Sequence, residues 1–347
     1  MSEIENGVAA AQPPTGSKDA VGRVASELIR AAAVGIACAI DGLGDGSDRE
    51  GVHRIRVSLR RAVALLEGFS AVLPGKRLRR CIGSLDALLG SLGRMRDLDA
   101  AIQYLDSLDK SGLSRMHLQG LDRLRLRLCQ KLYKRRPAME ADIERFRDSG
   151  ELDWLFRISD RLGRPGRSEP ATSLETLAAA AFEKHLGPLV SYDETLQDED
   201  DTEALHRFRI AVKKARYTLD AFDGLTCIPL ESHRARFRRL QDILGTLHDC
   251  DVWSVRLDSF RNKEREFTVR FYGTDTPFRR VTPGICFLED RISRDRKKAF
   301  GRLRREWLAT RASGFPGILI TAMKALAASA SACEGGEGDR EENRGEE

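Results

Sequence analysis

The sequence predicts an all-helical protein composed of two similar halves. Charged residues make up 32% of the chain and aromatic residues only 6%, a balance that favours long surface helices because strands prefer β-branched and aromatic side chains. The segments that begin at Val52 and Leu205 each place apolar residues at helical spacing beside a row of basic residues. The chain therefore contains the same amphipathic, basic helix twice.

The first half is predicted to span residues 19–160 and to follow a flexible leader, residues 1–18. Its first helix runs from near Asp19 to Ile40, and the glycines that come next end it. Ser47 and Glu50 form a capping box for the basic helix, which stops at a Pro-Gly pair.

Two further helices complete the first half. One starts near Lys76 and continues through Tyr104, and the other begins after a Ser-Gly break and again carries basic residues beside leucines. Pro137 is expected to interrupt or kink this last helix, because proline has no backbone N–H to donate.

The second half is predicted to span residues 171–332, after a linker of residues 161–170 that is rich in Gly, Pro and Arg. An acidic tail, residues 333–347, is expected to be solvated and disordered. The predicted order within this half is a helix through Leu186, the basic helix from Leu205, a helix from Ser232 to about Phe260, an irregular segment at 262–283, a basic-striped helix after Gly284, and a short apolar helix from Ile318 to Ala330.

The formal net charge of +5 understates how basic the body of the chain is. The segment from Glu334 to Glu347 holds seven acidic residues and two arginines, a net charge of −5 that leaves +10 on residues 1–333. A body of this charge favours anionic partners.

Cysteine usage and hydropathy favour a soluble, cytoplasmic protein. The seven cysteines are scattered without any C-x-x-C spacing, which favours reduced, mostly buried thiols over a disulfide framework or a zinc site. The apolar run from Ala31 to Ile40 is too short to cross a bilayer. No metal, cofactor or membrane partner is expected.

Three pairs of matching segments relate the two halves. His53 corresponds to His206, Leu89-Gly90-Ser91-Leu92 to Leu244-Gly245-Thr246-Leu247, and Gly120 to Gly284, at offsets of 153, 155 and 164 residues. A near-constant offset indicates an ancient duplication. After the matched glycine the first half reads Arg96-Asp97-Leu98-Asp99 where the second reads Leu247-His248-Asp249-Cys250-Asp251, with three residues fewer in the second half.

These motifs together resemble the CHAD domain, the histidine-marked α-helical domain. The resemblance rests on His-x-x-Arg-[hydrophobic]-x-x-[Arg/Lys]-[Arg/Lys] near the start of a helix, followed by a Leu-Gly-x-Leu turn with Arg-Asp-Leu-Asp, and it covers roughly residues 19–332. It implies two antiparallel four-helix bundles related by a pseudo-twofold axis. It also implies that basic helices line a central groove that binds inorganic polyphosphate.

Four basic stripes fit the chemistry of such a ligand. Polyphosphate carries about one negative charge per phosphate and no bases, so its receptor needs many cations and hydrogen-bond donors along a groove. On this interpretation the polyphosphate-binding residues are His53, Arg56, Arg60, Arg61, Arg123, Arg127, Lys131, Lys134, His206, Arg209, Lys213, Lys214, Arg216, Arg291, Arg294, Lys298 and Arg302.

Plainer interpretations apply to each feature taken alone. A single basic stripe is more often a solvated helix face, and a helix-start histidine can equally cap or orient its helix. Arg96 beside Asp97 favours an internal salt bridge over a metal site. His248-Asp249 lacks the further histidines and aspartates that a metal-dependent phosphohydrolase needs.

The sequence predicts a binding module without catalytic residues, because no nucleophile–base pair, nucleotide loop or carboxylate cluster stands out. The expected partners are inorganic polyphosphate, polyphosphate granules and their enzymes, with no membrane or nucleic acid. Two alternatives stay open. One is a general polyanion-binding or nucleic-acid-binding helical protein, favoured by the charge of the body. The other is a phosphatase that acts on polyphosphate.

Overall fold

The computed structural model describes residues 19–44, 48–164 and 173–342. Within these ranges the ordered elements are helices, without a strand, so the predicted all-helical fold is confirmed. The predicted leader, most of the predicted linker and the last five residues of the acidic tail lie outside the described residues.

The described part of the first half contains five α-helices, each packed against its neighbours in the chain or in space. α1 packs against α2 and α5, α2 packs against α3, and α3 packs against α4. Their bounds are α1 Asp19–Asp41, α2 Arg49–Gly68, α3 Gly75–Ser107, α4 Arg115–Arg147 and α5 Glu151–Leu162, with a short 3-10 helix at Ser70–Val72.

The second half repeats this order of packing. α6 packs against α7 and α11, α7 against α8, and α8 against α10. The bounds are α6 Leu174–Leu186, α7 Thr202–Ala221, α8 Glu231–Tyr272, α9 Thr276–Arg279, α10 Thr282–Ala312 and α11 Gly317–Glu342, with a 3-10 helix at Gly187–Leu196. The duplicated order of motifs is therefore matched by a duplicated order of packing. The pseudo-twofold axis itself stays a prediction.

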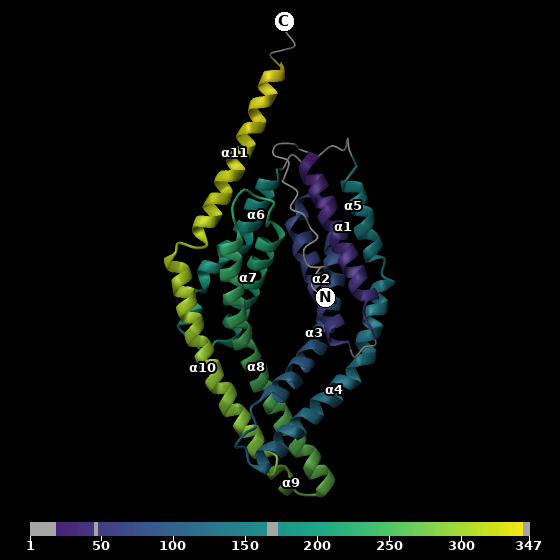
Figure 1. The fold of residues 1–347 in the computed structure, drawn as a ribbon, viewed down its shortest axis with the longest axis vertical. Helices are drawn as coiled ribbons and strands as arrows, with labels where there is room; N and C mark the ends of the chain where they lie inside the picture. The colour runs from purple at the N-terminus through teal and green to yellow at the C-terminus, as the bar shows by residue number, and fades with distance from the viewer. Residues whose placement is uncertain (1–18, 45–47, 165–172, 343–347) are drawn as a thin grey trace.

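The two halves meet in two places. α2 packs against α7, and Phe69 stacks on Phe222 with ring centroids 6.0 Å apart where the two helices end. At the opposite end of the molecule the tips of α3, α4, α8 and α10 converge (Figure 1) and share a second core that includes Leu105, Leu128 and Leu257. These two contacts hold α2, α3, α7 and α8 around the middle of the molecule.

Two glycines permit the crossing of α4 and α10. A Cβ atom on Gly120 would lie 2.8 Å from the Cα atom of Gly284, and a Cβ atom on Gly284 would lie 2.8 Å from the Cα atom of Gly120. Any larger side chain would force the helices apart. The pair of glycines matched between the halves in the sequence thus lies at one of the places where the halves touch.

The buried positions of α3 and α8 correct the predicted alignment of the repeats. They coincide at an offset of 152 residues, with Leu85, Leu88, Leu92, Met95, Leu98 and Leu105 on α3 and Phe237, Leu240, Leu244, Leu247, Cys250 and Leu257 on α8. Gly245 therefore corresponds to Gly93 and not to Gly90. The error arose because the first half contains two Leu-Gly pairs one turn apart. At the corrected offset Asp97 matches Asp249, and no residues are missing from the second half.

The prediction of an irregular segment at 262–283 is wrong for its first part, because α8 continues to Tyr272. Phe260, Glu264 and Thr268 are buried at a spacing of four residues and extend the buried face of the helix. The Thr268 hydroxyl donates to the Glu264 carbonyl, 2.7 Å away. Because Glu264 and Thr268 are polar, the sequence shows no apolar periodicity in this part of the helix, although these positions are buried.

Three smaller expectations also change. α4 continues through Pro137, which is exposed. The N-cap of α2 is Asp48, whose carboxylate accepts a 2.8 Å hydrogen bond from the backbone N–H of Gly51, whereas Ser47 lies outside the described residues. α11 extends to Glu342 and so includes most of the predicted disordered tail.

The described cysteines have free thiols. The prediction that most of them are buried is wrong for three. Cys38, Cys227 and Cys286 are exposed, whereas Cys81 and Cys250 are buried. No single helix among the described residues is long and apolar enough to cross a membrane; α10 and the start of α11 meet that criterion only as a pair bent by 42°.

Candidate anion-binding groove

Four cations from α2 and α7 form a central cluster, which consists of Arg56, Arg60, Arg209 and Lys213. Each helix buries one face, including Ile55 and Leu59 on α2 and Phe208 and Val212 on α7. The basic residues follow these apolar ones by one position, so they lie on an adjoining face at a spacing of four residues. Packing α2 against α7 brings the two basic faces together.

The electrostatics of Lys213 show how concentrated this charge is. Burial, followed by the charges of Arg60, Arg209, Arg56 and Arg216, lowers the pKa of Lys213 to about 7. An ammonium group among four guanidinium groups is disfavoured because like charges repel and little water is present to screen them. The cluster therefore concentrates positive charge that no ion pair in the described chain neutralises.

The arginines of the cluster are half-buried and lack carboxylate partners. Burial and then Arg60 lower the pKa of Arg56 to about 10, although Asp97 opposes this change. The Nε atom of Arg209 is buried without a hydrogen-bond partner. Within the described chain none of the four cluster residues forms an ion pair. Each keeps donors available for an anion.

Arg216 lies at the edge of the cluster and is held by its surroundings. Its Nη1 atom donates to Asp220 over 2.9 Å and its Nε atom to Gln241 over 2.7 Å, while its guanidinium lies 4.6 Å from the centroid of the Tyr217 ring. Tyr217 thus packs against Arg216. Arg216 is less available to a ligand than the four cluster residues.

A basic cleft of about 490 Å³ adjoins the cluster between α3, α4 and α8. Its lining residues are Arg94, Asp97, Leu98, Lys131, Lys134, Arg135, Arg256 and Lys263. Burial, then Lys263, Arg256 and Arg135, lower the pKa of Lys131. Six cations and one carboxylate line this cleft, so it extends the positive surface away from the cluster.

Asp97 connects the cluster and the basic cleft. It lines the cleft, its charge favours the protonated forms of Arg56 and Arg209, and its carbonyl accepts a 3.4 Å hydrogen bond from Nη2 of Arg256. Asp249, the equivalent residue on α8, has its pKa raised by burial while Arg209 opposes the change. Each repeat therefore contributes a carboxylate whose charge acts on the arginines of the cluster.

The two helix-start histidines differ in their surroundings. The ring of His206 lies 5.0 Å from that of His248, and burial, Arg209 and His206 lower the pKa of His248 to about 4. His248 is therefore neutral at pH 7. His53 is exposed and has no hydrogen-bond, ion-pair or ring partner in the described chain.

The remaining predicted residues of α2 and α7 lie outside the cluster. Arg61 lines a separate cavity of about 490 Å³ between α1, α2, α7 and α8, together with Arg216 and Tyr217. Lys214 is exposed, and its charge acts on Asp86.

The predicted stripe on α4 divides into two parts. Arg123 and Arg127 donate from their Nε atoms to the buried carboxylate of Glu264, over 2.5 and 2.7 Å. Lys131 and Lys134 have no ion-pair partner in the described chain and line the basic cleft. Only the second pair therefore offers free charge to an anion.

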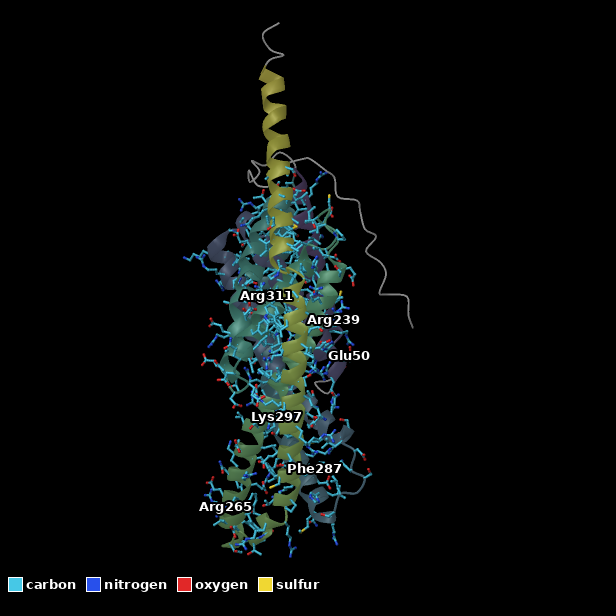
Figure 2. The ribbon with its side chains drawn as sticks, turned by 90° about the vertical axis from the view of Figure 1, so that its left-hand side faces the viewer. Glu50, Arg239, Arg265, Phe287, Lys297 and Arg311 are labelled. Carbon is cyan, nitrogen blue, oxygen red and sulfur yellow. The ribbon has the colours of Figure 1, made fainter. Side chains whose placement is uncertain are left out.

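The structure does not bring the predicted stripe on α10 to the cluster. α10 lies along the side of the second half that is remote from α2 (Figure 1), and the view onto that side shows Lys297 and Arg311 on it (Figure 2). Arg291 pairs with Asp295 at 3.9 Å, and Nε of Arg294 donates to its own helix. Lys298 and Arg302 are exposed.

Sequence reasoning missed four cations that line the basic cleft, namely Arg94, Arg135, Arg256 and Lys263. Lys263 falls in the segment predicted to be irregular, and the buried row that continues through Phe260 and Glu264 was the signal that could have included it in α8. The others required knowledge of which helix faces meet. No group of three or more described histidine, cysteine or acidic residues is arranged to hold a metal ion.

Comparisons with known proteins identify the fold. The family model described as the CHAD domain matches residues 24–258. The chain is similar to the crystal structure of the CHAD domain from the plant Ricinus communis, with a TM-score of 0.60, 19% identity, and coverage of 86% of this chain and 95% of that one. It is also similar to PptA from Streptomyces chartreusis, with a TM-score of 0.57, 16% identity, and coverage of 83% and 99%. A comparison with curated proteins finds no match.

Proposed function

The chain belongs to the CHAD domain family, and from this premise we propose that it binds inorganic polyphosphate between α2 and α7 without catalysing a reaction on it. The observation that carries the proposal is the central cluster. Arg56, Arg60, Arg209 and Lys213 lie close enough for their charges to act on one another, without an ion pair in the described chain. A polyanion would relieve this repulsion.

The chemistry of the cluster suits a chain of phosphates. Arginines donate planar, permanently charged forks to neighbouring phosphate oxygens, and a lysine supplies a point charge that can follow a flexible ligand. The basic cleft continues the positive surface through Lys131, Lys134 and Arg256. A phosphate chain longer than the cluster would therefore meet further cations beyond Asp97.

The proposed role is that of a receptor that recruits the protein to polyphosphate granules or to the enzymes that act there. The alternative of a polyphosphate phosphatase makes a different prediction. A phosphatase would release orthophosphate from polyphosphate in the presence of Mg²⁺ or Mn²⁺, whereas a receptor would leave the chain length unchanged. Gel analysis of polyphosphate length after incubation with the protein separates the two.

A charge-reversal experiment tests the location of the site. Arg56→Glu combined with Arg209→Glu should abolish binding of labelled long-chain polyphosphate and leave helicity intact, since both side chains lie on polar faces. The control is Lys298→Glu combined with Arg302→Glu on α10, which makes the same change in net charge at exposed positions away from the groove.

The control should retain binding within a few-fold. Equal loss of affinity in both double variants would reduce the groove to a general polyanion surface, and unchanged binding in the first would place the site elsewhere. Competition with RNA at equal phosphate concentration adds a second criterion, because displacement by RNA would favour the nucleic-acid alternative.

A further inference from the structure

A small cavity of about 170 Å³ opens beside the basic cleft, and we call it the aromatic slot. Its walls include Phe260, Phe267 and Gln130. Lys131, Lys134 and Lys263 line both the slot and the basic cleft. An apolar slot thus shares three lysines with a cleft suited to phosphates.

The ring of Phe267 is held in place although it is exposed. The side chain is 54% exposed, and the guanidinium of Arg127 lies over the ring, 5.2 Å from its centroid. Glu264 fixes Arg127 by accepting from its Nε atom over 2.7 Å. The result is a positioned aromatic face at the mouth of the slot, and a bare phosphate chain has no group that would use it.

Gln130 adds a polar group to the same slot. Its side-chain oxygen accepts from Nη1 of Arg127 over 3.0 Å, which directs the amide oxygen toward the arginine and leaves the amide NH2 group to donate. A flat ring that lay on Phe267 could therefore accept a hydrogen bond from Gln130 at its edge.

We propose that the aromatic slot binds the base of a nucleoside polyphosphate, such as ATP, whose phosphates lie in the basic cleft. The inference rests on the proposed function, because the same cations hold the phosphates. It adds a ligand class that combines a phosphate chain with one flat, hydrogen-bonding ring. Stacking on an aromatic side chain tolerates any base, since every base has a π-face.

The position of the slot shows that it is an addition to the repeated structure. At the offset of 152 residues, the end of α3 at Ser107 corresponds to Ser259 on α8. α8 continues for more than three further turns beyond Ser259, and Phe267 lies in this extension. The match to the family model also ends before it, at residue 258. Only the second half therefore builds an aromatic wall against the cleft.

Titrations of the full chain with ATP and with tripolyphosphate test the inference. Both ligands carry three phosphates, but only ATP has a base. Phe267→Ala should weaken ATP binding about tenfold through loss of one stacked base, with tripolyphosphate affinity unchanged. Phe267→Tyr should restore ATP binding because it keeps the ring.

The matched control is Phe271→Ala, which removes an 81% exposed aromatic side chain from the same extension without touching the slot. This variant should bind both ligands like the parent protein. Circular dichroism checks that all variants fold.

Three results would overturn the inference. They are an unchanged ATP affinity in Phe267→Ala, an equal loss of ATP and tripolyphosphate affinity in that variant, and no binding of ATP by the parent protein. Long-chain polyphosphate is titrated in parallel. If it still binds while ATP does not, the base-binding slot is refuted and the proposed function stands; if long-chain polyphosphate does not bind, the proposed function fails as well.

Discussion

The low pKa of Lys213 predicts that polyphosphate binding depends on pH between about pH 6 and pH 9. Burial and four neighbouring arginines hold this pKa at about 7, against an ordinary value of 10.5. A phosphate placed in the cluster favours the charged lysine and raises its pKa again. Binding above pH 7 must therefore be accompanied by proton uptake.

The size of the effect follows from the two pKa values. If the bound lysine regains its ordinary pKa, affinity falls about tenfold from pH 6 to pH 8 and about a hundredfold from pH 6 to pH 9, which is about 1.4 kcal/mol for each tenfold step. Below pH 6 the lysine is charged in both states, so this dependence disappears. His248 has a pKa of about 4 and does not titrate in the window.

The same shift predicts the opposite trend for the stability of the ligand-free protein. The folded state has the lower pKa, so the unfolded state binds more protons between about pH 7 and 10.5. The charged lysine destabilises the free fold below about pH 7, and stability rises with pH through this window.

The assay is fluorescence anisotropy of labelled long-chain polyphosphate at constant ionic strength between pH 6 and pH 9. Internal phosphates stay ionised throughout, so the ligand charge is nearly constant. Lys213→Arg should bind with little pH dependence because arginine keeps its charge. If Lys213→Arg shows the same slope as the parent protein, another group is responsible and the reasoning is refuted.

Three further predictions concern the fold and the charge of the groove. Gly120→Ala should lower the free energy of unfolding by about 2 kcal/mol, because the new Cβ atom collides with α10. The control Gly245→Ala should not lower the free energy of unfolding, because a Cβ atom there meets nothing within 4 Å. Equal denaturation midpoints for the two variants would contradict the close crossing of α4 and α10. Glu264→Gln should destabilise the protein by about 2 kcal/mol in thermal unfolding, since it leaves Arg123 and Arg127 without a carboxylate, and an unchanged midpoint would show that the pairs contribute nothing. Polyphosphate affinity should fall about a hundredfold between 50 and 200 mM salt if about five phosphates are contacted, whereas a salt-independent affinity would exclude the cation groove.

The sequence predicted correctly the features that depend only on residues a few positions apart in the chain. The faces of α2 and α7 follow from helical geometry alone, so the sequence is sufficient to place Arg56 beside Arg60 and Arg209 beside Lys213. The duplication and the all-helical fold follow from the same periodicity. The end of α8 was misplaced because buried Glu264 and Thr268 do not look like core residues.

The basic stripes on α4 and α10 are similar in sequence but lie in different environments in the folded protein. On α4, the carboxylate of Glu264 reaches across from α8 to neutralise Arg123 and Arg127, while Lys131 and Lys134 stay available in the cleft. On α10, the stripe lies on a side of the molecule that does not border the groove. Nothing in the local sequence of either helix distinguishes these outcomes.

The helices, their repetition and the faces on which the cations lie can be derived from the amino-acid sequence alone, because they depend on residues a few positions apart in the chain. The packing of the helices against one another determines which cations meet, which are neutralised by a distant carboxylate, and where Phe267 forms the aromatic slot beside the basic cleft. These properties depend on contacts between residues more than a hundred positions apart, such as Arg123 and Glu264.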